Sequence, residues 1–292
     1  MSDLQQDMFV AEWLLDCYES GLGKTESAWA LSALQKIFPR SCLKTSWKVL
    51  DAWQQQVPVK QAPAAPPEVI HALISMALLL NRPHLACAML LCYVGLLRVR
   101  EALNLTWDDV IVDHGCVTLC LGRTKRGMEQ RVVLNNVAVC AWIAQYALRF
   151  PSRHGHDSFL KLSYSSALRG VRRVAELLGL GNLHLTTHSF RRSGASELSR
   201  QGMALSDILL YGRWLSDKAA RDYIRRGEVA MIRAKQQLHA GDWIRILRWG
   251  SFASKAWPCY DYMYQHNKFS VDMRRLTPQV LAQVEAHLFL QA

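Results

Sequence analysis

Residues 188–223 read HSFRRSGASELSRQGMALSDILLYGRWLSDKAARDY, and the rest of the chain is organised around this stretch. His188 and Arg191 are three residues apart, so on a helix they share one face. The apolar residues after them predict a second short helix, which YGRW at 211–214 breaks before a third helix carrying Tyr223. The stretch therefore offers an imidazole, a guanidinium, an indole N–H and a phenol.

Positive charge is concentrated in the middle of the 292-residue chain. The whole sequence has 35 Lys and Arg against 24 Asp and Glu, a net charge of +11. Residues 61–227 contain 21 basic and 12 acidic side chains, whereas residues 1–60 contain 6 and 7. Such a field is expected where a protein meets a polyanion. A basic protein with no such partner would show the same balance, so charge alone leaves both interpretations open.

The composition argues against several other classes of protein. The eight cysteines form no C-x-x-C pair and lie mostly in apolar runs, which predicts buried free thiols in a reducing compartment. We expect no secretory signal, because the first ten residues lack a basic n-region, and no membrane span. His184 and His188 have a spacing that suits a metal, but no third ligand accompanies them, so we expect none.

Proline content divides the chain. Residues 58–68 (PVKQAPAAPPE) contain four prolines and predict a stiff linker, with a domain boundary near residue 62. Apolar stripes before it predict three helices, at about 3–21, 25–37 and 41–53. We therefore expect a short helical domain at 1–61, a main domain at 62–240 and a C-terminal extension at 241–292. A helix in that extension, at about 277–288, is a candidate for docking on a second protomer, and packing on its own domain is the alternative.

The main domain has a mixed pattern. Apolar runs predict a helix from Val69 to Leu80 and another from Pro83 to about Leu103, and later helices are expected at about 137–149 and 164–179. Three apolar segments, at 110–112, 116–121 and 130–134, predict an antiparallel sheet with a basic turn at 122–127. The fold class we expect is mainly α with a small three-stranded antiparallel sheet.

Two motifs together resemble the tyrosine recombinase (phage integrase) family. The first is H-x-x-R, followed by G-R-W at 212–214 and by Tyr223, nine residues after the Trp. The second is GLLRVREAL at 95–103, which is similar to the G-L-R-I-S-E-L-like segment of the family. The resemblance extends over about 94–226. It implies a tyrosine recombinase catalytic domain, preceded here by a short helical domain.

The resemblance also implies a chemistry, namely DNA phosphodiester transesterification without a metal or nucleotide cofactor. Arg98 and Arg191 would hold the non-bridging oxygens of the phosphate with forked, charged donors. Tyr223 would attack phosphorus and leave a 3′-phosphotyrosine. The alternative for Tyr223 is an ordinary buried aromatic side chain. Arg98 follows an apolar run, so we expect it to be buried, and the alternative for it is a structural salt bridge to Glu101.

The remaining roles follow from the same resemblance. His188 would be the base, Trp214 would offer its indole N–H, and Glu101 would orient a neighbouring group. Lys125, in the basic turn, would protonate the leaving 5′ oxygen, with Arg126 as a rival in the same turn. The alternative is a solvated basic turn, which the sequence alone would favour. Basic side chains expected to contact the DNA backbone, or else to form solvated faces, are Arg123, Arg126, Arg169, Arg172, Arg173 and Arg192.

The function we expect is DNA cleavage and rejoining by a recombinase or integrase of a mobile element. Its partners would be double-stranded DNA and further copies of the chain, inside the cell, in the nucleus of a eukaryote or the cytoplasm of a bacterium. Three alternatives remain open. They are a catalytically silent DNA-binding protein derived from a recombinase, a type IB topoisomerase, and a basic helical protein that binds no nucleic acid.

Overall fold

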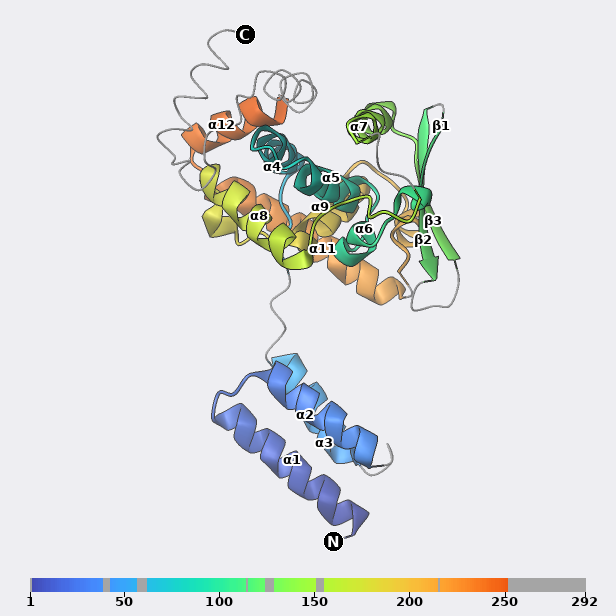
Figure 1. Cartoon of the computed structure of the whole chain (residues 1–292). Helices are drawn as coiled ribbons and strands as arrows, with labels where there is room; N and C mark the ends of the chain where they lie inside the picture. Colours follow the sequence, from blue (N-terminus) through green and yellow to red (C-terminus); the bar gives the residue numbers. More distant parts are fainter. Residues whose placement is uncertain are drawn as a thin grey trace. The chain divides into compact units, whose positions relative to one another are not determined.

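The computed structural model describes residues 2–38, 43–56, 62–113, 115–123, 129–150, 155–214 and 216–251 (Figure 1). The chain separates into two compact units, Met1–Gln61 and Ala62–Ala292. Each has its own cluster of buried apolar side chains.

The described residues of the first unit form three helices, α1 (Asp3–Glu19), α2 (Lys24–Ile37) and α3 (Lys44–Gln56). Leu14, Leu31 and Leu50, one from each helix, are buried in its core. The buried carboxylate of Asp7 on α1 accepts hydrogen bonds from the first backbone amides of α3, those of Thr45 and Ser46, at 2.8 and 2.9 Å. These amides have no partner inside the helix, so Asp7 caps α3 and joins it to α1.

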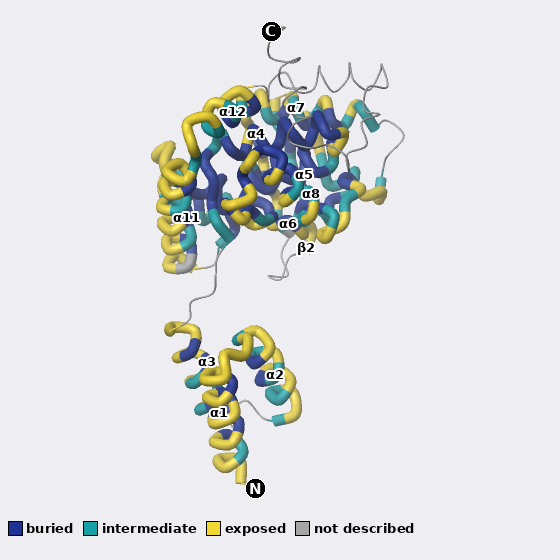
Figure 2. Tube along the Cα trace, turned by 90° about the vertical axis from the view of Figure 1, so that its left-hand side faces the viewer, coloured by how far each residue is buried: buried dark blue, intermediate teal, exposed yellow. Residues whose placement is uncertain are grey.

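Two apolar helices form the centre of the second unit. They are α4 (Pro67–Leu79) and α5 (Pro83–Val94), and both begin with a proline, whose missing N–H costs nothing in the first turn. Figure 2 shows buried residues along both helices. A helix that is apolar on every side must be covered on every side. The other helices of the unit provide this cover.

Besides α4, α5 and the sheet, the described part of the unit contains seven helices and two 3₁₀ turns. In chain order they are α6 (Val99–Leu103), η2 (Trp107–Asp109), α7 (Val137–Leu148), α8 (Tyr164–Leu177), η3 (Gly181–Leu183), α9 (Thr187–Arg200), α10 (Leu205–Gly212), α11 (Asp217–Gln237) and α12 (Ala240–Ser251). Side-chain caps start two of them, because Asn136 accepts a hydrogen bond from Val139 N (3.1 Å) and Ser163 from Ser166 N (3.2 Å).

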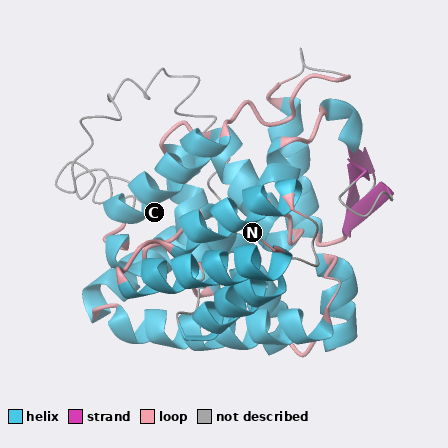
Figure 3. Ribbon diagram, turned by 90° about the horizontal axis from the view of Figure 1, so that it is seen from below, coloured by secondary structure: helices cyan, strands magenta, loops and turns pink. Residues whose placement is uncertain are grey.

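The sheet has three antiparallel strands, β1 (Val110–Asp113), β2 (Cys116–Arg123) and β3 (Glu129–Leu134), in the order β1-β2-β3. It lies at one edge of the helical unit (Figure 3). Its register places Thr118 opposite Ile111 and Val133. Val117 and Leu119 are buried, so alternate residues of β2 face the core. The predicted fold class is confirmed.

One predicted helix was wrong in its extent. The helix expected from Pro83 to Leu103 ends at Val94, and a separate helix starts at Val99. Between them Leu96 adopts a left-handed conformation, with φ +47°. This turn frees the Leu96 carbonyl from helical hydrogen bonding, and two arginines of the candidate active site donate to it. An apolar run cannot show such a break, because its hydrophobicity continues through it.

Part of the predicted C-terminal extension packs on the second unit. α12 lies against α4 (Figure 1), and its Ile246 and Trp249 are buried. The helix expected at 277–288 lies outside the described residues. The cysteines described as free are Cys17, Cys87, Cys92, Cys116, Cys120 and Cys140. Among the described helices, none has the length and apolar character that crossing a membrane requires.

Candidate active site

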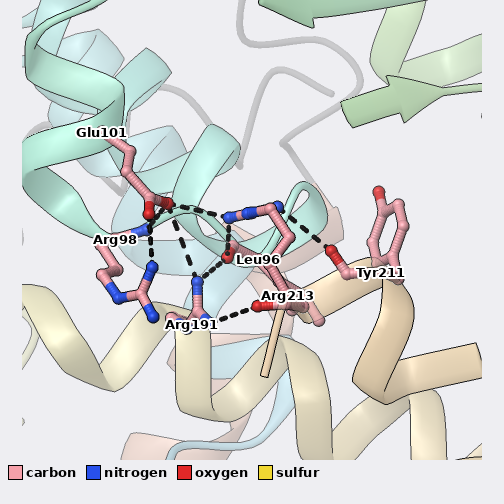
Figure 4. A network of polar contacts seen from close by, with 7 residues as sticks. Leu96, Arg98, Glu101, Arg191, Tyr211 and Arg213 are labelled. Atoms are coloured by element: carbon pink, nitrogen blue, oxygen red, sulfur yellow. Dashed lines mark hydrogen bonds and ion pairs between the residues drawn. The ribbon is translucent and has the colours of Figure 1, made fainter. Parts of the chain in front are cut away.

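The carboxylate of Glu101 lies beside three guanidinium groups, those of Arg98, Arg191 and Arg213 (Figure 4). Arg98 donates to it twice, from its backbone amide (2.8 Å) and from Nη1 (2.6 Å). Arg213 Nη2 donates to Oε2 at 2.8 Å, and Arg191 Nη1 lies 3.9 Å from the same oxygen. One negative charge cannot neutralise three positive ones. The cluster therefore keeps a net positive charge that favours a bound anion.

The charge state of Glu101 follows from these contacts. Burial raises the pKa of its carboxyl, but the Arg98 amide and the Arg213 guanidinium outweigh burial and lower the pKa below its usual value. The carboxyl is therefore ionised at neutral pH. It fixes the positions of the surrounding arginines, since a charged pair holds its geometry better than a neutral one.

Replacing Glu101 with Gln tests this role. Glu101→Gln leaves the buried Arg191 and Arg213 without their counter-ion, so we expect the free energy of unfolding to fall by about 3 kcal/mol. Chemical denaturation measures it. Asp217→Asn is the matched control, because it removes an exposed partner from Arg221 (2.8 Å) and should change stability by less than about 1 kcal/mol. Equal effects of the two substitutions would contradict a structural role for Glu101.

Arg191 is the buried arginine of the cluster, with its side chain only 5% exposed. It donates to the carbonyls of Leu96 and Gly212, and its guanidinium lies 4.5 Å from the centre of the Trp214 ring. Burial, followed by the charges of Arg98 and Arg213, lowers its pKa to about 10. Arg191 therefore remains charged at neutral pH, and the two carbonyls fix its orientation.

Arg98 lies where it can reach solvent. The expectation that it is buried was wrong, because its side chain is 49% exposed. It precedes the first residue of α6, at the turn that ends the apolar run, and this position directs it outwards. The salt bridge to Glu101 considered as an alternative is present. It leaves an exposed guanidinium beside a buried one, a suitable pair for a phosphate arriving from solvent.

Tyr223 lies within the same group of cations. It is on α11, and its ring centre is 5.5 Å from that of Trp214. Burial raises the pKa of the Tyr223 phenol, while the charges of Arg191, Arg192 and Arg98 act in the opposite direction. The phenol is therefore protonated in the resting protein, among cations that would stabilise its anion.

His188 is one turn before Arg191 on α9. Burial, then the charges of Arg191 and Arg98, lower the pKa of its imidazole, so that it is neutral at pH 7 and able to accept a proton. His184 precedes this helix and has a left-handed backbone, with φ +48°. The two histidines therefore lack the helical spacing that their sequence separation suggested. Within the described residues no cluster of His, Cys, Asp or Glu could hold a metal ion.

The comparison with known families gives the affiliation of the chain. Residues 67–228 match the model of the phage integrase family, and these residues are more than half of the chain. The chain belongs to the phage integrase family. The matched residues include the whole arginine cluster and the tyrosine.

The relatives are similar only in part. Tyrosine recombinase XerD of Neisseria meningitidis serogroup B (strain ATCC BAA-335 / MC58) is 31% identical over 125 residues, which are 39% of this chain and 41% of XerD. The chain thus spans less than half the length of this relative. Two crystal structures of the XerH site-specific recombinase bound to difH substrates share the fold. The pre-cleavage complex has 16% identity and a TM-score of 0.52, over 74% of this chain and 66% of XerH. The post-cleavage complex, with a palindromic difH substrate, has 15% identity and a TM-score of 0.53, over 79% of this chain and 72% of XerH.

Sequence reasoning missed Arg213, which lies inside a motif of this family. Its backbone is left-handed, with φ +59°, and its guanidinium donates to the carbonyls of Leu96 (3.0 Å) and Tyr211 (3.1 Å) as well as to Glu101. The neighbouring Gly212 leaves space for the indole, because a Cβ there would lie 1.7 Å from the Trp214 ring. The signal in the sequence was a charged residue between Gly212 and Trp214. Its partner, Glu101, is 112 residues away along the chain, so the pairing could not be predicted.

Apart from Arg192, the other basic residues that the sequence singled out fall into two groups. Lys125 and Arg126 fall outside the described residues, as does the side chain of Arg123. On α8, Arg169 and Arg172 are exposed, and Arg173 lies 3.8 Å from Glu176. Arg169 and Arg173 line a groove of about 440 Å³ that also includes Arg82.

Arg192 does not fit the prediction of a DNA contact. It is 3% exposed, because it is on the side of α9 that faces α11 and the start of the second unit. Its guanidinium lies over the Tyr223 ring, 4.3 Å from its centre. A side chain buried in this way cannot extend along a DNA backbone.

Proposed function

We propose that this protein cleaves and rejoins DNA strands through a 3′-phosphotyrosine on Tyr223. The observation that carries the proposal is the position of Tyr223 beside two buried arginines. Its ring lies under the Arg192 guanidinium (4.3 Å) and 5.5 Å from the Trp214 ring, over which the Arg191 guanidinium lies. A lone buried tyrosine needs no such surroundings. Fixed positive charge that surrounds a nucleophile and extends to the solvent favours a reaction in which a phosphate gains negative charge.

The proposed reaction is a transesterification at a DNA phosphate. The phenol oxygen attacks phosphorus, and the bond between phosphorus and the 5′ oxygen breaks. His188, neutral at pH 7, takes the phenol proton. Arg98 and Arg191 hold the non-bridging oxygens, and Trp214 packs against Arg191 and offers its indole N–H. Attack by a 5′ hydroxyl then reverses the step.

The proton for the leaving 5′ oxygen is assigned to Lys125, on the resemblance of the turn at 122–127 to the family. Arg126 is a poorer acid, since a guanidinium holds its proton more tightly than an ammonium.

The proposed partners are double-stranded DNA and further copies of the chain. XerH was crystallised on its difH substrate, and the 21 basic against 12 acidic residues of 61–227 suit a duplex in this protein as well. Recombination or integration of a mobile element, inside the cell that holds the DNA, is the biological role that we infer. The α8 arginines and those of the basic turn would contact the backbone of the duplex.

A suicide substrate tests the proposal. A pool of nicked duplexes, from which the short 5′-hydroxyl fragment diffuses away after cleavage, should accumulate a protein–DNA adduct that survives denaturation. Binding without any adduct would indicate a catalytically silent DNA-binding protein. Relaxation of supercoiled plasmid by the monomer, at no preferred sequence, would indicate a topoisomerase.

DNA affinity should fall steeply with salt. If about six phosphates are contacted, the association constant should fall by roughly 10³-fold between about 50 and 200 mM salt, because bound counter-ions are released. Fluorescence anisotropy with a labelled duplex measures this. A flat response to salt would exclude a mainly electrostatic contact with DNA.

The pH dependence of cleavage should report His188. Because its pKa is lowered below 6.5, the base stays neutral until the pH falls through that lowered value. The acid limb of kcat/KM, which reflects the free protein, should therefore lie below pH 6.5. We expect this limb to disappear in His188→Asn, at a reduced rate. An unchanged limb in that variant would assign the base to another group.

A further inference from the structure

Helix α9 and the tyrosine-bearing helix α11 are held together at close range. Gly227 of α11 lies directly on α9, where a Cβ would be 2.0 Å from Ser196 Oγ and 3.1 Å from Arg192 Cγ. One turn before it, the carbonyl of Ile224 accepts a hydrogen bond from Ser196 Oγ at 3.2 Å. The backbone beside Tyr223 is thus fixed relative to α9. The tyrosine hydroxyl, at the end of a long side chain, needs its own restraint.

Arg192 supplies a contact to that hydroxyl. The guanidinium lies over the Tyr223 ring, 4.3 Å from its centre, and while burial raises the pKa of the phenol, hydrogen bonding from Arg192 is among the influences that lower it. The same guanidinium donates from Nη1 to the carbonyl of Ala62 at 2.7 Å. A planar fork of this kind holds two acceptors in a fixed relation, which a lysine cannot do.

Ala62 begins the second unit, at the point where the chain arrives from the N-terminal helices. The residues after it are attached to α9 by a second bond, from Ala65 N to Ser193 Oγ at 2.8 Å. Ala64 and Ala65 are buried, at 1% and 0% exposure. Two consecutive residues of α9 therefore hold the incoming chain, and one of them also holds the tyrosine.

We propose that Arg192 is a positioning residue, which couples the chain segment 62–65 to the hydroxyl of Tyr223. The coupling runs both ways, since two groups that share one guanidinium influence each other equally. Displacement of this segment would release the tyrosine, and a change at the tyrosine would loosen the segment. The inference rests on the proposed role of Tyr223 only for its effect on cleavage.

Hydrogen exchange of the amides of Ala64 and Ala65 tests the coupling without DNA. Tyr223→Phe removes only the hydroxyl on α11, and it should accelerate exchange in this segment by roughly 10-fold, the effect of one weakened hydrogen bond. Arg192→Met should accelerate it at least as much. Tyr211→Phe is the matched control, because it deletes a hydroxyl bonded to Val94 O (2.8 Å) elsewhere in the unit. Unchanged exchange in Tyr223→Phe, or the same change in Tyr211→Phe, would overturn the proposal.

Cleavage provides the second readout. Arg192→Met should slow formation of the adduct by roughly 10- to 100-fold, whereas Arg200→Met, on an exposed part of the same helix, should not. Arg192→Lys keeps the positive charge but cannot hold two acceptors at once, so it should remain nearly as slow as Arg192→Met. A wild-type cleavage rate in Arg192→Lys would show that only the charge matters and would overturn the proposal. Absence of any adduct from the wild-type protein would overturn the proposed function, and the exchange result would still decide the coupling.

Discussion

Tyr223→Phe should bind DNA like the wild-type protein and form no covalent adduct. Phenylalanine keeps the ring that packs against Trp214 and under Arg192, but it lacks the attacking oxygen. Loss of a nucleophile typically lowers a rate by roughly 10⁴-fold or more. A denaturing gel of the suicide-substrate reaction measures the adduct, and anisotropy at low salt measures binding.

Tyr211→Phe is the control for this experiment. It makes the same chemical change on α10, where the hydroxyl is already bonded to the Val94 carbonyl, and it should retain the adduct. Normal adduct formation by the Tyr223 variant would assign the nucleophile elsewhere. The pairing with Arg191 and Arg192 would then be structural.

Arg191→Ala should lower the cleavage rate by about 10³-fold, and Arg98→Ala by about 10²-fold or more. Each substitution removes a positive charge that would stabilise the negatively charged transition state. The larger loss is expected at Arg191, which is buried and held by two carbonyls, because preorganised charge in a site with little water stabilises more strongly. Single-turnover kinetics on the suicide substrate measure both rates.

A loss of folding would imitate this result, so stability must be measured beside the rate. Because the Arg98 side chain is half exposed, Arg98→Ala should change the free energy of unfolding little. A loss of rate in this variant can therefore be attributed to the missing positive charge. Arg200→Ala is the matched control on α9, since its side chain is 47% exposed and lies 3.6 Å from Glu197, away from the arginine cluster. Rates within a few-fold of wild type for both Arg98→Ala and Arg191→Ala would refute the phosphate-binding role.

The candidate site could be predicted from the sequence because its residues fall into two short motifs. His188, Arg191 and Tyr223 are near one another along the chain, and helical periodicity correctly predicted the helices that carry them. The link to Arg98 came only from the resemblance. Nothing in residue spacing indicates that a carboxylate at position 101 bonds an arginine at position 213.

The sequence could not show where a helix breaks within an apolar run, or which distant side chains contact each other. The turn at Leu96 lies within an apolar run, and its left-handed backbone leaves no signature in a residue that normally avoids that conformation. Arg192 looked like one more basic residue beside Arg191. Its burial depends on the return of α11 and of residues 62–65 to the same side of α9, which is a tertiary contact.

The central claim is that Tyr223 carries the covalent link to DNA. Mass spectrometry of the adduct trapped on a nicked duplex tests it most directly, after digestion with trypsin and a nuclease. The account predicts a nucleotide joined through its 3′ phosphate to the peptide that contains Tyr223, with the fragment ions placing it on that residue. A nucleotide on any other residue, or one joined through its 5′ phosphate, would contradict the account.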